Sequence, residues 1–579
     1  FGLGTDQHLM GDLLGYWRRE RQVVSADAYR LSIASEADQF ESLSAITRLT
    51  FQRLEPQISA KTGKPLKWPW ARFTFPPQPI DVEIGKGSKL IVALNEQEWL
   101  FFTVEQIDAA AGELALTWNG DAEAAGVYPS SLVHYVWFQE GAKLQALEEL
   151  ADEMLAGRGD RVGHAMLRRD PPVFLPGSGP AGGEFAADVP AICAWATGLD
   201  RSYVPIQGPP GTGKTYTGAQ LVHTLVTAGL RVGITAMSHA AIDNLMQAVV
   251  DRFKEEGDSG KLRAVRKAKE GALRGIRYVD DNAGVARSGF NVVAGTTWLF
   301  ASKPMREVPD DVLLVDEAGQ LGHADTLAST ISATNVNLLG DPQQLPQVSQ
   351  ASHPGGAGAS ALEHLLDGDI TVPADRGVLL ETTWRMHPDV CEFISDVMYG
   401  GRLHSHPCCG GQSVAGATGL RWLRAEHKGR STESPEEAAI VVAKVRELLG
   451  RPWTDQHGVT RPLTVRDFMV VAPYNDQRRR ITEALQVDPA ARRVEVGTVD
   501  KFQGREAAVV LFSMATSSAE YMPRSADFLF SKNRLNVAIS RARCLAYLVC
   551  TDELLDTRAR NVEEMTLISA LCSFVDRAA

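Results

Sequence analysis

A glycine-rich turn between an apolar strand and a helix is the feature that most restricts the fold of this 579-residue sequence. The turn, GPPGTGKT at 208–215, has the pattern G-x-x-x-x-G-K-[ST] and follows the apolar run YVPIQ at 203–207. Glycines let the backbone curl so that its N–H groups face phosphate oxygens, and the start of the next helix adds partial positive charge. We therefore expect a phosphate-binding loop whose contacts come from Gly208, Gly211, Thr212 and Gly213.

After residue 200 the chain repeats the order strand, turn, helix, which is typical of parallel sheets with helices on both faces. Two such series predict two α/β domains in tandem, at 184–373 and 374–579. Ahead of them, short β-forming runs at 68–135 predict a small β-barrel domain. It lies between an N-terminal helical region at 1–67 and a helical stalk and linker at 136–183.

Composition narrows the setting of the protein. No apolar run approaches the roughly 18 residues that span a bilayer, and the first residues lack the basic head of a signal peptide. Seven scattered cysteines suit a reducing compartment, and the adjacent Cys408 and Cys409 predict a plain loop more than a metal site. We expect a soluble, cytoplasmic protein without a membrane partner. Because the first residue is Phe, we also expect a piece of a longer polypeptide.

The charge balance weakly disfavours a nucleic-acid coat protein. The formal net charge is −12, whereas a protein that covers nucleic acid without reading its sequence is usually basic. A protein can still line one groove with Arg and Lys while the rest of its surface stays acidic. Nucleic-acid binding therefore stays open on charge alone.

Four side chains predict how the loop would handle a nucleoside triphosphate. Lys214 is placed to bridge the β- and γ-phosphates, and the Thr215 hydroxyl to hold Mg²⁺. The segment DEAGQ at 316–320 follows an apolar strand, at the sheet edge where ligands bind. There Asp316 would position Mg²⁺, and Glu317 would orient and deprotonate the attacking water.

Ordered motifs from about residue 200 to 550 resemble those of superfamily 1 helicases. Besides the loop and DEAGQ, they are GITAMSHAAIDNL (233–245), GTTWL (295–299), GDPQQLPQ (340–347), TTWRMHP (382–388), VAPYNDQ (471–477), TVDKFQGRE (498–506) and NVAISRAR (536–543). The nearest resemblance is to the branch with the nonsense-mediated decay helicase, and to the helicase half of bacterial putative RecB-type nuclease–helicase fusions. It implies two RecA-like P-loop domains, ATP and Mg²⁺ as cofactors, and 5′→3′ movement along a single strand.

The resemblance also assigns catalytic roles in the two domains. Gln344 would sense the γ-phosphate, and Arg385 and Arg541 would neutralise the charge that develops during hydrolysis. Because these arginines lie in the second domain, ATP would clamp the domains together. For Arg541 alone, a solvated arginine at a helix end is the plain alternative. Nucleotide contacts are further implied for Gln503, Gly504 and Glu506.

Two positions depart from the family pattern around the nucleotide base. Relatives carry a Gln about twenty residues before the P-loop that reads adenine, whereas this chain has none before Gln207, so adenine selectivity stays open. Trp384 stands where the family has Tyr. Trp384 can stack on a base as well as Tyr, and its alternative is a packed core residue.

The resemblance also suggests where a single strand of nucleic acid would bind. Hydroxyl and backbone groups grip phosphates without reading sequence. The basic stretch 261–277 is interpreted as a solvated helix or as an insert facing the strand, and Trp298 as a base-stacking or a core residue. Contacts with the nucleic-acid backbone are implied for Ser238, His239, Thr296 and Thr498.

Three functions are compatible with these residues to different degrees. The favoured one is an ATP-dependent helicase or translocase on single strands, with DNA preferred to RNA. The second is an ATP-gated clamp or switch without processive unwinding. A P-loop enzyme acting on a small molecule other than ATP is disfavoured by the distal arginines and strand motifs. A nuclease domain or partner is possible, although no nuclease-like set of Asp, Glu and Lys occurs here.

Overall fold

The computed structural model describes residues 2–578 apart from 3, 59–62, 82–83, 96, 137–140, 288, 503 and 524–525. Its contacts divide the chain into two compact units. The large unit comprises Phe1–Met10, Ala142–Val348 and Gly356–Ala579, and the small unit comprises Gly11–Gly141 and Ser349–Gly355. Among the described helices, none combines the length and apolar character needed to cross a bilayer.

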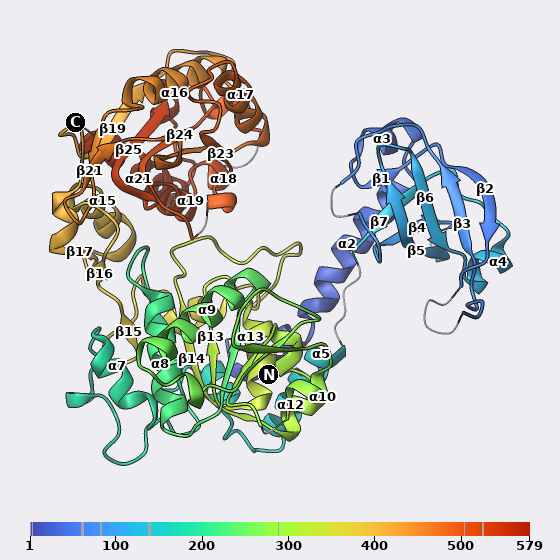
Figure 1. Ribbon diagram of the computed structural model, residues 1–579, viewed down its shortest axis with the longest axis horizontal. Helices are drawn as coiled ribbons and strands as arrows, with labels where there is room; N and C mark the ends of the chain where they lie inside the picture. Colours follow the sequence, from blue (N-terminus) through green and yellow to red (C-terminus); the bar gives the residue numbers. More distant parts are fainter. Residues whose placement is uncertain are drawn as a thin grey trace. The chain divides into compact units, whose positions relative to one another are not determined.

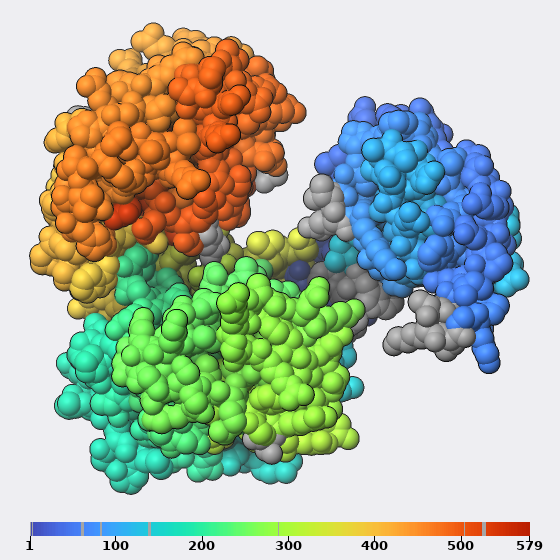
Figure 2. Space-filling model, viewed as in Figure 1, coloured from blue at the N-terminus to red at the C-terminus, as the bar shows by residue number. Residues whose placement is uncertain are grey.

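The small unit, blue in Figures 1 and 2, is built on an antiparallel sheet where a small β-barrel was expected. Its long strand β5 pairs with β4 through its first half and with β6 through its second half. Alternate side chains along a strand, such as Phe102 and Val104, are buried in the hydrophobic core of this unit, which also contains Phe73. The hydrogen-bonded order is β1 (Ala45–Ile46), β7 (Leu132–Tyr135), β4 (Lys89–Ala93), β5 (Trp99–Asp108), β6 (Glu113–Thr117), β3 (Trp70–Thr74) and β2 (Thr50–Glu55).

The first sheet of the large unit is parallel throughout and has helices on both faces (Figure 1). Val312 and Leu314 pack toward α8 (Lys214–Thr227) and α9 (His239–Glu255), and the intervening Leu313 packs toward the opposite face. The strands are therefore apolar throughout, as expected for a sheet covered on both sides. Their order is β11 (Ile276–Val279), β10 (Ala264–Lys267), β12 (Val292–Ala294), β9 (Val232–Thr235), β13 (Asp310–Val315), β14 (Ala333–Gly340), β8 (Tyr203–Gln207) and β15 (Val378–Leu379).

The second sheet of the large unit is also parallel. Val509 and Leu511 pack toward α16 (Pro435–Leu448), whereas Val510 and Phe512 pack toward α15 (Pro388–Tyr399). The strand order is β19 (Gly419–Arg424), β25 (Ala542–Cys550), β24 (Ala507–Ser513), β22 (Phe468–Val471) and β23 (Glu495–Gly497). Two parallel sheets flanked by helices confirm the predicted α/β class.

Two local expectations differ from the structure. The first domain was expected to end at residue 373, but β15 pairs with β8 and extends the first sheet past that residue. The basic stretch 261–277 is not a helix: it contributes β10 and the start of the edge strand β11. Arg266 explains the second difference, because its side chain is 1% exposed and its Nε donates to the Asp243 carboxylate at 2.8 Å. A buried guanidinium with a partner is part of the packing, not of a solvated face.

Two buried histidines lie in the first half of the large unit. His323 opens α13 (His323–Ser329) and His364 lies in α14 (Ala361–Leu366), with ring centroids 4.1 Å apart. The His364 ring donates from Nε2 to the Met166 and Leu167 carbonyls at 3.2 and 3.1 Å. Within the described part of the chain, neither ring nitrogen of His323 has a hydrogen-bond partner. Burial lowers the pKa of both rings, that of His364 to about 4.

This pair predicts acid sensitivity. Because the folded pKa of His364 is below its ordinary value of 6.5, the unfolded chain binds more protons between these limits. The contribution of the neutral His364 ring to the free energy of unfolding is fully present above about pH 6.5. It is lost as the pH falls toward 4, and the loss amounts to about 3 kcal/mol for this ring. Thermal unfolding measured from pH 7 to pH 4 should show a smaller fall of the unfolding temperature for His364→Gln than for the wild type. The Gln side chain keeps a donor for the two carbonyls. Equal losses in wild type and variant would contradict this, and His457→Gln, an exposed site, is the control.

Candidate active site

The glycine-rich loop joins β8 to α8, which begins at Lys214. Gly211 and Gly213 have φ values of 77° and 85°, a region that other residues rarely adopt. Lys214 folds back over the loop, and its Nζ donates to the Gly208 carbonyl at 2.6 Å. The loop therefore places an ammonium group and a helix N-terminus beside one small space, as a phosphate site requires.

The loop is bonded to the segment that leads into the second sheet. The Trp384 backbone N–H donates to the Gly211 carbonyl at 2.8 Å, and the Thr383 hydroxyl donates to the Pro210 carbonyl at 2.9 Å. A Cβ at Gly211 would lie 2.5 Å from the Thr383 hydroxyl oxygen. Glycine is thus needed here for close approach as well as for its backbone angle.

A cavity of about 320 Å³ brings most of the predicted nucleotide and catalytic residues together. Gly208 and Asp316 are not among its lining residues, and Gln503 lies outside the described residues. Both parallel sheets contribute: the first through loops that follow β8, β13 and β14, and the second through residues that directly precede β24 and β25. The predicted residues in its lining are Gly211, Thr212, Gly213, Lys214, Thr215, Glu317, Gln344, Trp384, Arg385, Gly504, Glu506 and Arg541.

The acidic pair follows β13. Asp316 is 6% exposed and accepts a hydrogen bond from the Glu317 backbone N–H at 2.9 Å. Burial raises the pKa of Asp316 to about 7, the Glu317 charge adds to the rise, and the Lys214 ammonium opposes it. Glu317 has a φ of 51°, an uncommon angle for a residue with a side chain and one often found at functional sites.

The oxygen donors of Thr215 and Asp316 fit Mg²⁺. This hard cation prefers oxygen ligands and usually keeps several from substrate phosphates and water. In the described residues, no group of three or more His, Cys, Asp or Glu side chains forms a metal cluster of its own. A cation at this site would therefore depend on the phosphates, and it would offset the cost of keeping the buried Asp316 ionised.

The loop after β13 packs directly on the loop after β14. A Cβ at Gly319 would lie 2.5 Å from the Asp341 carbonyl oxygen, and one at Gly340 would lie 2.6 Å from the Gly319 nitrogen. The Ala318 backbone N–H also donates to the Leu339 carbonyl at 2.8 Å. The glycines of both motifs are thus needed because two backbones touch, which places Glu317 and Gln344 at one cavity.

Arg541 is buried at 2% exposure, so the solvated helix-end alternative is wrong. Its guanidinium donates to the carbonyls of Val537 and Arg505, at 2.9 and 3.3 Å, and to Gln344 Oε1 at 3.4 Å. Burial lowers the pKa of Arg541 to about 9, and the neighbouring Arg385 charge adds to this, so the group remains a cation at neutral pH.

Arg385 is held in place by residues that lie further along the chain, near the second sheet. Its Nε donates to the Glu506 carboxylate at 2.7 Å, and its Nη1 donates to the Ser540 carbonyl at 3.2 Å. The ion pair occupies the position where nucleotide contacts were expected from both residues. A triphosphate in the cavity would compete with Glu506 for the guanidinium, since phosphate also binds arginine in a bidentate manner.

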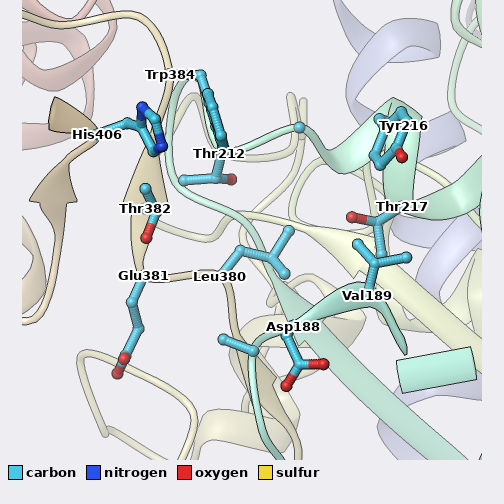
Figure 3. A pocket seen from close by; sticks show the side chains of 13 residues that line it. Asp188, Val189, Thr212, Tyr216, Thr217, Leu380, Glu381, Thr382, Trp384 and His406 are labelled. Carbon is cyan, nitrogen blue, oxygen red and sulfur yellow. The ribbon is translucent and has the colours of Figure 1, made fainter. Parts of the chain in front are cut away.

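A second cavity, of about 770 Å³, shares Gly211–Gly213 and Trp384 with the phosphate cavity (Figure 3). Trp384 is 52% exposed and stacks on the His406 ring, with centroids 3.6 Å apart, so the core alternative for this Trp is wrong. Tyr216 and Asp188 also line this space (Figure 3). Aromatic walls beside a phosphate site suit a nucleotide base.

Gln207 takes no part in that cavity. Its side chain is buried, accepts from the Val372 N–H at 2.9 Å and donates to the Ile370 carbonyl at 3.2 Å. Among the described residues, no glutamine lines this second cavity, which we call the base cavity. Tyr216, Asp188 and His406 were missed at the sequence level because they belong to no recognised motif.

A buried polar network joins the sensor loop, residues 341–344 after β14, to the helices α15 and α19 (Lys532–Ile539) of the second half of the unit. The Tyr399 hydroxyl donates to Asp341 Oδ2 at 2.7 Å, and the Asn536 amide donates to the Gln343 carbonyl and to Tyr399 Oη, both at 2.8 Å. Asn533 also donates to the Pro342 carbonyl at 2.9 Å. Sequence reasoning did not single out these side chains, although Asn536 opens the motif that contains Arg541.

The predicted strand-contacting residues are only partly brought together. Ser238 caps α9 by accepting from the Ala241 N–H at 3.1 Å, and His239 begins that helix. His239 and Thr296 line a third cavity, of about 450 Å³, whereas Ser238 and Thr498 are not among its lining residues. Thr498 lies just after β23 in the second half of the unit.

Comparisons with known proteins agree with this architecture. Two family models described as "AAA domain" match residues 191–361 and 358–553. The DNA replication ATP-dependent helicase/nuclease JHS1 of Arabidopsis thaliana is 26% identical over 377 residues, which cover 59% of this chain and 26% of that protein. The DNA replication ATP-dependent helicase/nuclease DNA2 of Gallus gallus is 30% identical over 359 residues (60% and 34%).

A further relative is the DNA-binding protein SMUBP-2 of Mesocricetus auratus, 24% identical over 476 residues that cover 67% of this chain and 46% of that protein. The matched region thus spans between a quarter and a half of the length of these relatives. The tandem family matches, the helicase relatives and the two parallel sheets that share one phosphate cavity agree with one another. The chain belongs to the superfamily 1 helicases and carries the ATP-hydrolysing core of that family.

Proposed function

We propose that this protein uses ATP hydrolysis to move along single-stranded nucleic acid, with DNA as the favoured track and 5′→3′ as the direction. The observation that carries the proposal is the phosphate cavity, to which loops of both parallel sheets contribute. Hydrolysis changes the charge between Lys214 on one side and Arg541 on the other. Such a change alters how tightly the two sides attract each other, which couples chemistry to motion.

Each predicted residue has a definite task in this mechanism. Lys214 binds the β- and γ-phosphates, and Glu317 orients the attacking water and accepts its proton. Arg541 and Arg385 stabilise the negative charge that grows on the transferred phosphoryl group. Mg²⁺, held through Thr215 and Asp316, would neutralise charge on the phosphate oxygens.

The preference for DNA rests on the relatives, two of which have DNA replication in their names and one of which is called a DNA-binding protein. Two are helicase/nucleases, so a nuclease domain or partner is part of the proposal. All seven cysteines are free, which suits a reducing compartment, and we propose a cytoplasmic location. The 5′→3′ direction rests on the motif resemblance.

The first measurement is steady-state ATPase activity with single-stranded DNA and RNA of one sequence. We expect strong stimulation, larger with DNA, and displacement of a labelled strand from duplexes with a 5′ tail but not from those with a 3′ tail. ATP-dependent strand binding without displacement would favour a clamp. Hydrolysis that responds to neither polymer would contradict the proposed coupling.

Replacing Lys214 by Ala should abolish ATP hydrolysis while leaving the fold intact, because the loop backbone and its glycines remain. Steady-state ATPase activity and circular dichroism measure the two effects separately. Lys303→Ala, at a lysine whose side chain is 85% exposed, is the matched control and should hydrolyse ATP normally. Normal hydrolysis by Lys214→Ala would show that the phosphate site has been misassigned.

Replacing Arg541 by Ala should lower kcat by roughly 10³-fold, the effect of removing a charge that acts in the transition state. The affinity for a fluorescent ADP analogue should change far less, because ADP lacks the transferred phosphoryl group. Thermal unfolding checks that loss of a buried guanidinium has not disrupted the fold, and exposed Arg558→Ala is the control. An unchanged kcat would assign Arg541 to packing alone.

A further inference from the structure

Cys408 lies beside an imidazole at the edge of the base cavity. It belongs to the short 3₁₀ helix η4 (Pro407–Gly411), where a plain loop was expected for the two adjacent cysteines. Its Sγ lies 3.0 Å from Nδ1 of His406, a residue that lines the base cavity. Cys408 is half-buried, so a small solute can reach its thiol.

The hydrogen bonds of His406 fix the direction of this contact. Its Nδ1 accepts the Cys408 backbone N–H at 3.3 Å, and a backbone N–H can only donate. The neutral ring therefore carries its proton on Nε2, and the Cys408 thiol donates to Nδ1. A thiol that donates to an imidazole can pass its proton to that base and react as a thiolate.

The other cysteines are in a different environment. Cys409 is adjacent, with its Sγ 4.0 Å from that of Cys408, but it is fully buried. Burial raises the pKa of all six other thiols, which therefore stay protonated at neutral pH and are poor nucleophiles. They are Cys193, Cys391, Cys409, Cys544, Cys550 and Cys572.

His406 connects the Cys408 thiol to the nucleotide site. Its ring stacks on Trp384, with centroids 3.6 Å apart, and both rings line the base cavity (Figure 3). Its backbone N–H donates to the Thr383 carbonyl at 2.9 Å, in the segment that passes over the phosphate loop. The 3.0 Å contact between sulfur and Nδ1 has no room for an added oxygen atom, so oxidation of Cys408 would displace the ring that supports Trp384.

We propose that Cys408 is a redox-sensitive modification site, that hydroperoxides oxidise it, and that its oxidation weakens nucleotide binding. His406 Nδ1 takes the thiol proton, and the thiolate attacks the terminal oxygen of the hydroperoxide. An S–O bond forms as the O–O bond breaks, and the leaving alkoxide or hydroxide takes the proton from His406. Sulfur is oxidised to a sulfenic acid and the hydroperoxide is reduced to an alcohol or water, a change that thiols reverse.

The test treats the protein with hydrogen peroxide and then with dimedone, which traps sulfenic acids. Mass spectrometry of the digest should find the first adduct on Cys408. Peroxide alone should weaken binding of a fluorescent ADP analogue by about five-fold, the loss of one aromatic contact, and a thiol reductant should restore it. Cys408→Ser keeps a hydroxyl for His406 and should bind the analogue equally before and after peroxide. Cys572→Ser, at another half-buried cysteine, should respond like the wild type.

A second variant tests His406 as the base. His406→Phe keeps a ring against Trp384 but lacks Nδ1. It should slow the reaction of Cys408 with peroxide at pH 7 by about ten-fold, since only a few per cent of an unassisted thiol is ionised there. At about pH 10 a thiol ionises without a base, and the two rates should converge.

Three outcomes would overturn this inference: a first adduct on another cysteine, equal rates at pH 7 in His406→Phe and wild type, or unchanged affinity for the analogue once Cys408 is oxidised. None of these readouts uses nucleic acid. The proposed movement along a strand is therefore tested separately, by DNA-stimulated ATPase activity.

Discussion

The hydrogen bond from the Trp384 backbone N–H to the Gly211 carbonyl joins the phosphate loop to the segment that leads into the second sheet. It forms only because Gly211 lacks a side chain and allows Thr383 and Arg385 to approach. The positions of Trp384 and Arg385 in the site depend on this approach. Trp384 can line the base cavity, and Arg385 the phosphate cavity, because the same short segment passes directly over the loop.

The opposite side of the phosphate cavity depends on buried polar contacts. Asp341 accepts from Tyr399, and Asn536 donates to both Tyr399 and the Gln343 carbonyl. Each such bond contributes about 1 kcal/mol, and an unpaired buried group costs about 1–3 kcal/mol. The network therefore favours one arrangement of the sensor loop, and Arg541 reaches Gln344 within it. A change of charge at the phosphates would therefore act directly on residues of the second half of the unit.

The first parallel sheet places two different chemistries along one edge. The loops after β8, β13 and β14 meet at the phosphate cavity, whereas the loops after β10, β11 and β12 meet at the third cavity, which Trp298 also lines. Between them, β9 leads into Ser238 and His239 at the start of α9. In the proposed function, a nucleic-acid strand and a triphosphate would thus bind along the same edge of the first sheet. The second sheet would then move relative to this sheet.

The sequence by itself determined the α/β class, and its short motifs were enough to predict the phosphate loop, the acidic pair and the two arginines. Only the tertiary structure decided that residues 264–267 and 276–279 are strands of the first sheet, since the burial of Arg266 depends on Asp243 and His239. It also decided that Trp384 is exposed, that Trp298 is half-buried, and that Gln207 is occupied by the backbone of residues 370–372. Local pattern records which residues follow a strand, whereas exposure and partners depend on segments that lie outside the motif, 23 residues away for Arg266 and Asp243 and 163 residues away for Gln207 and Ile370.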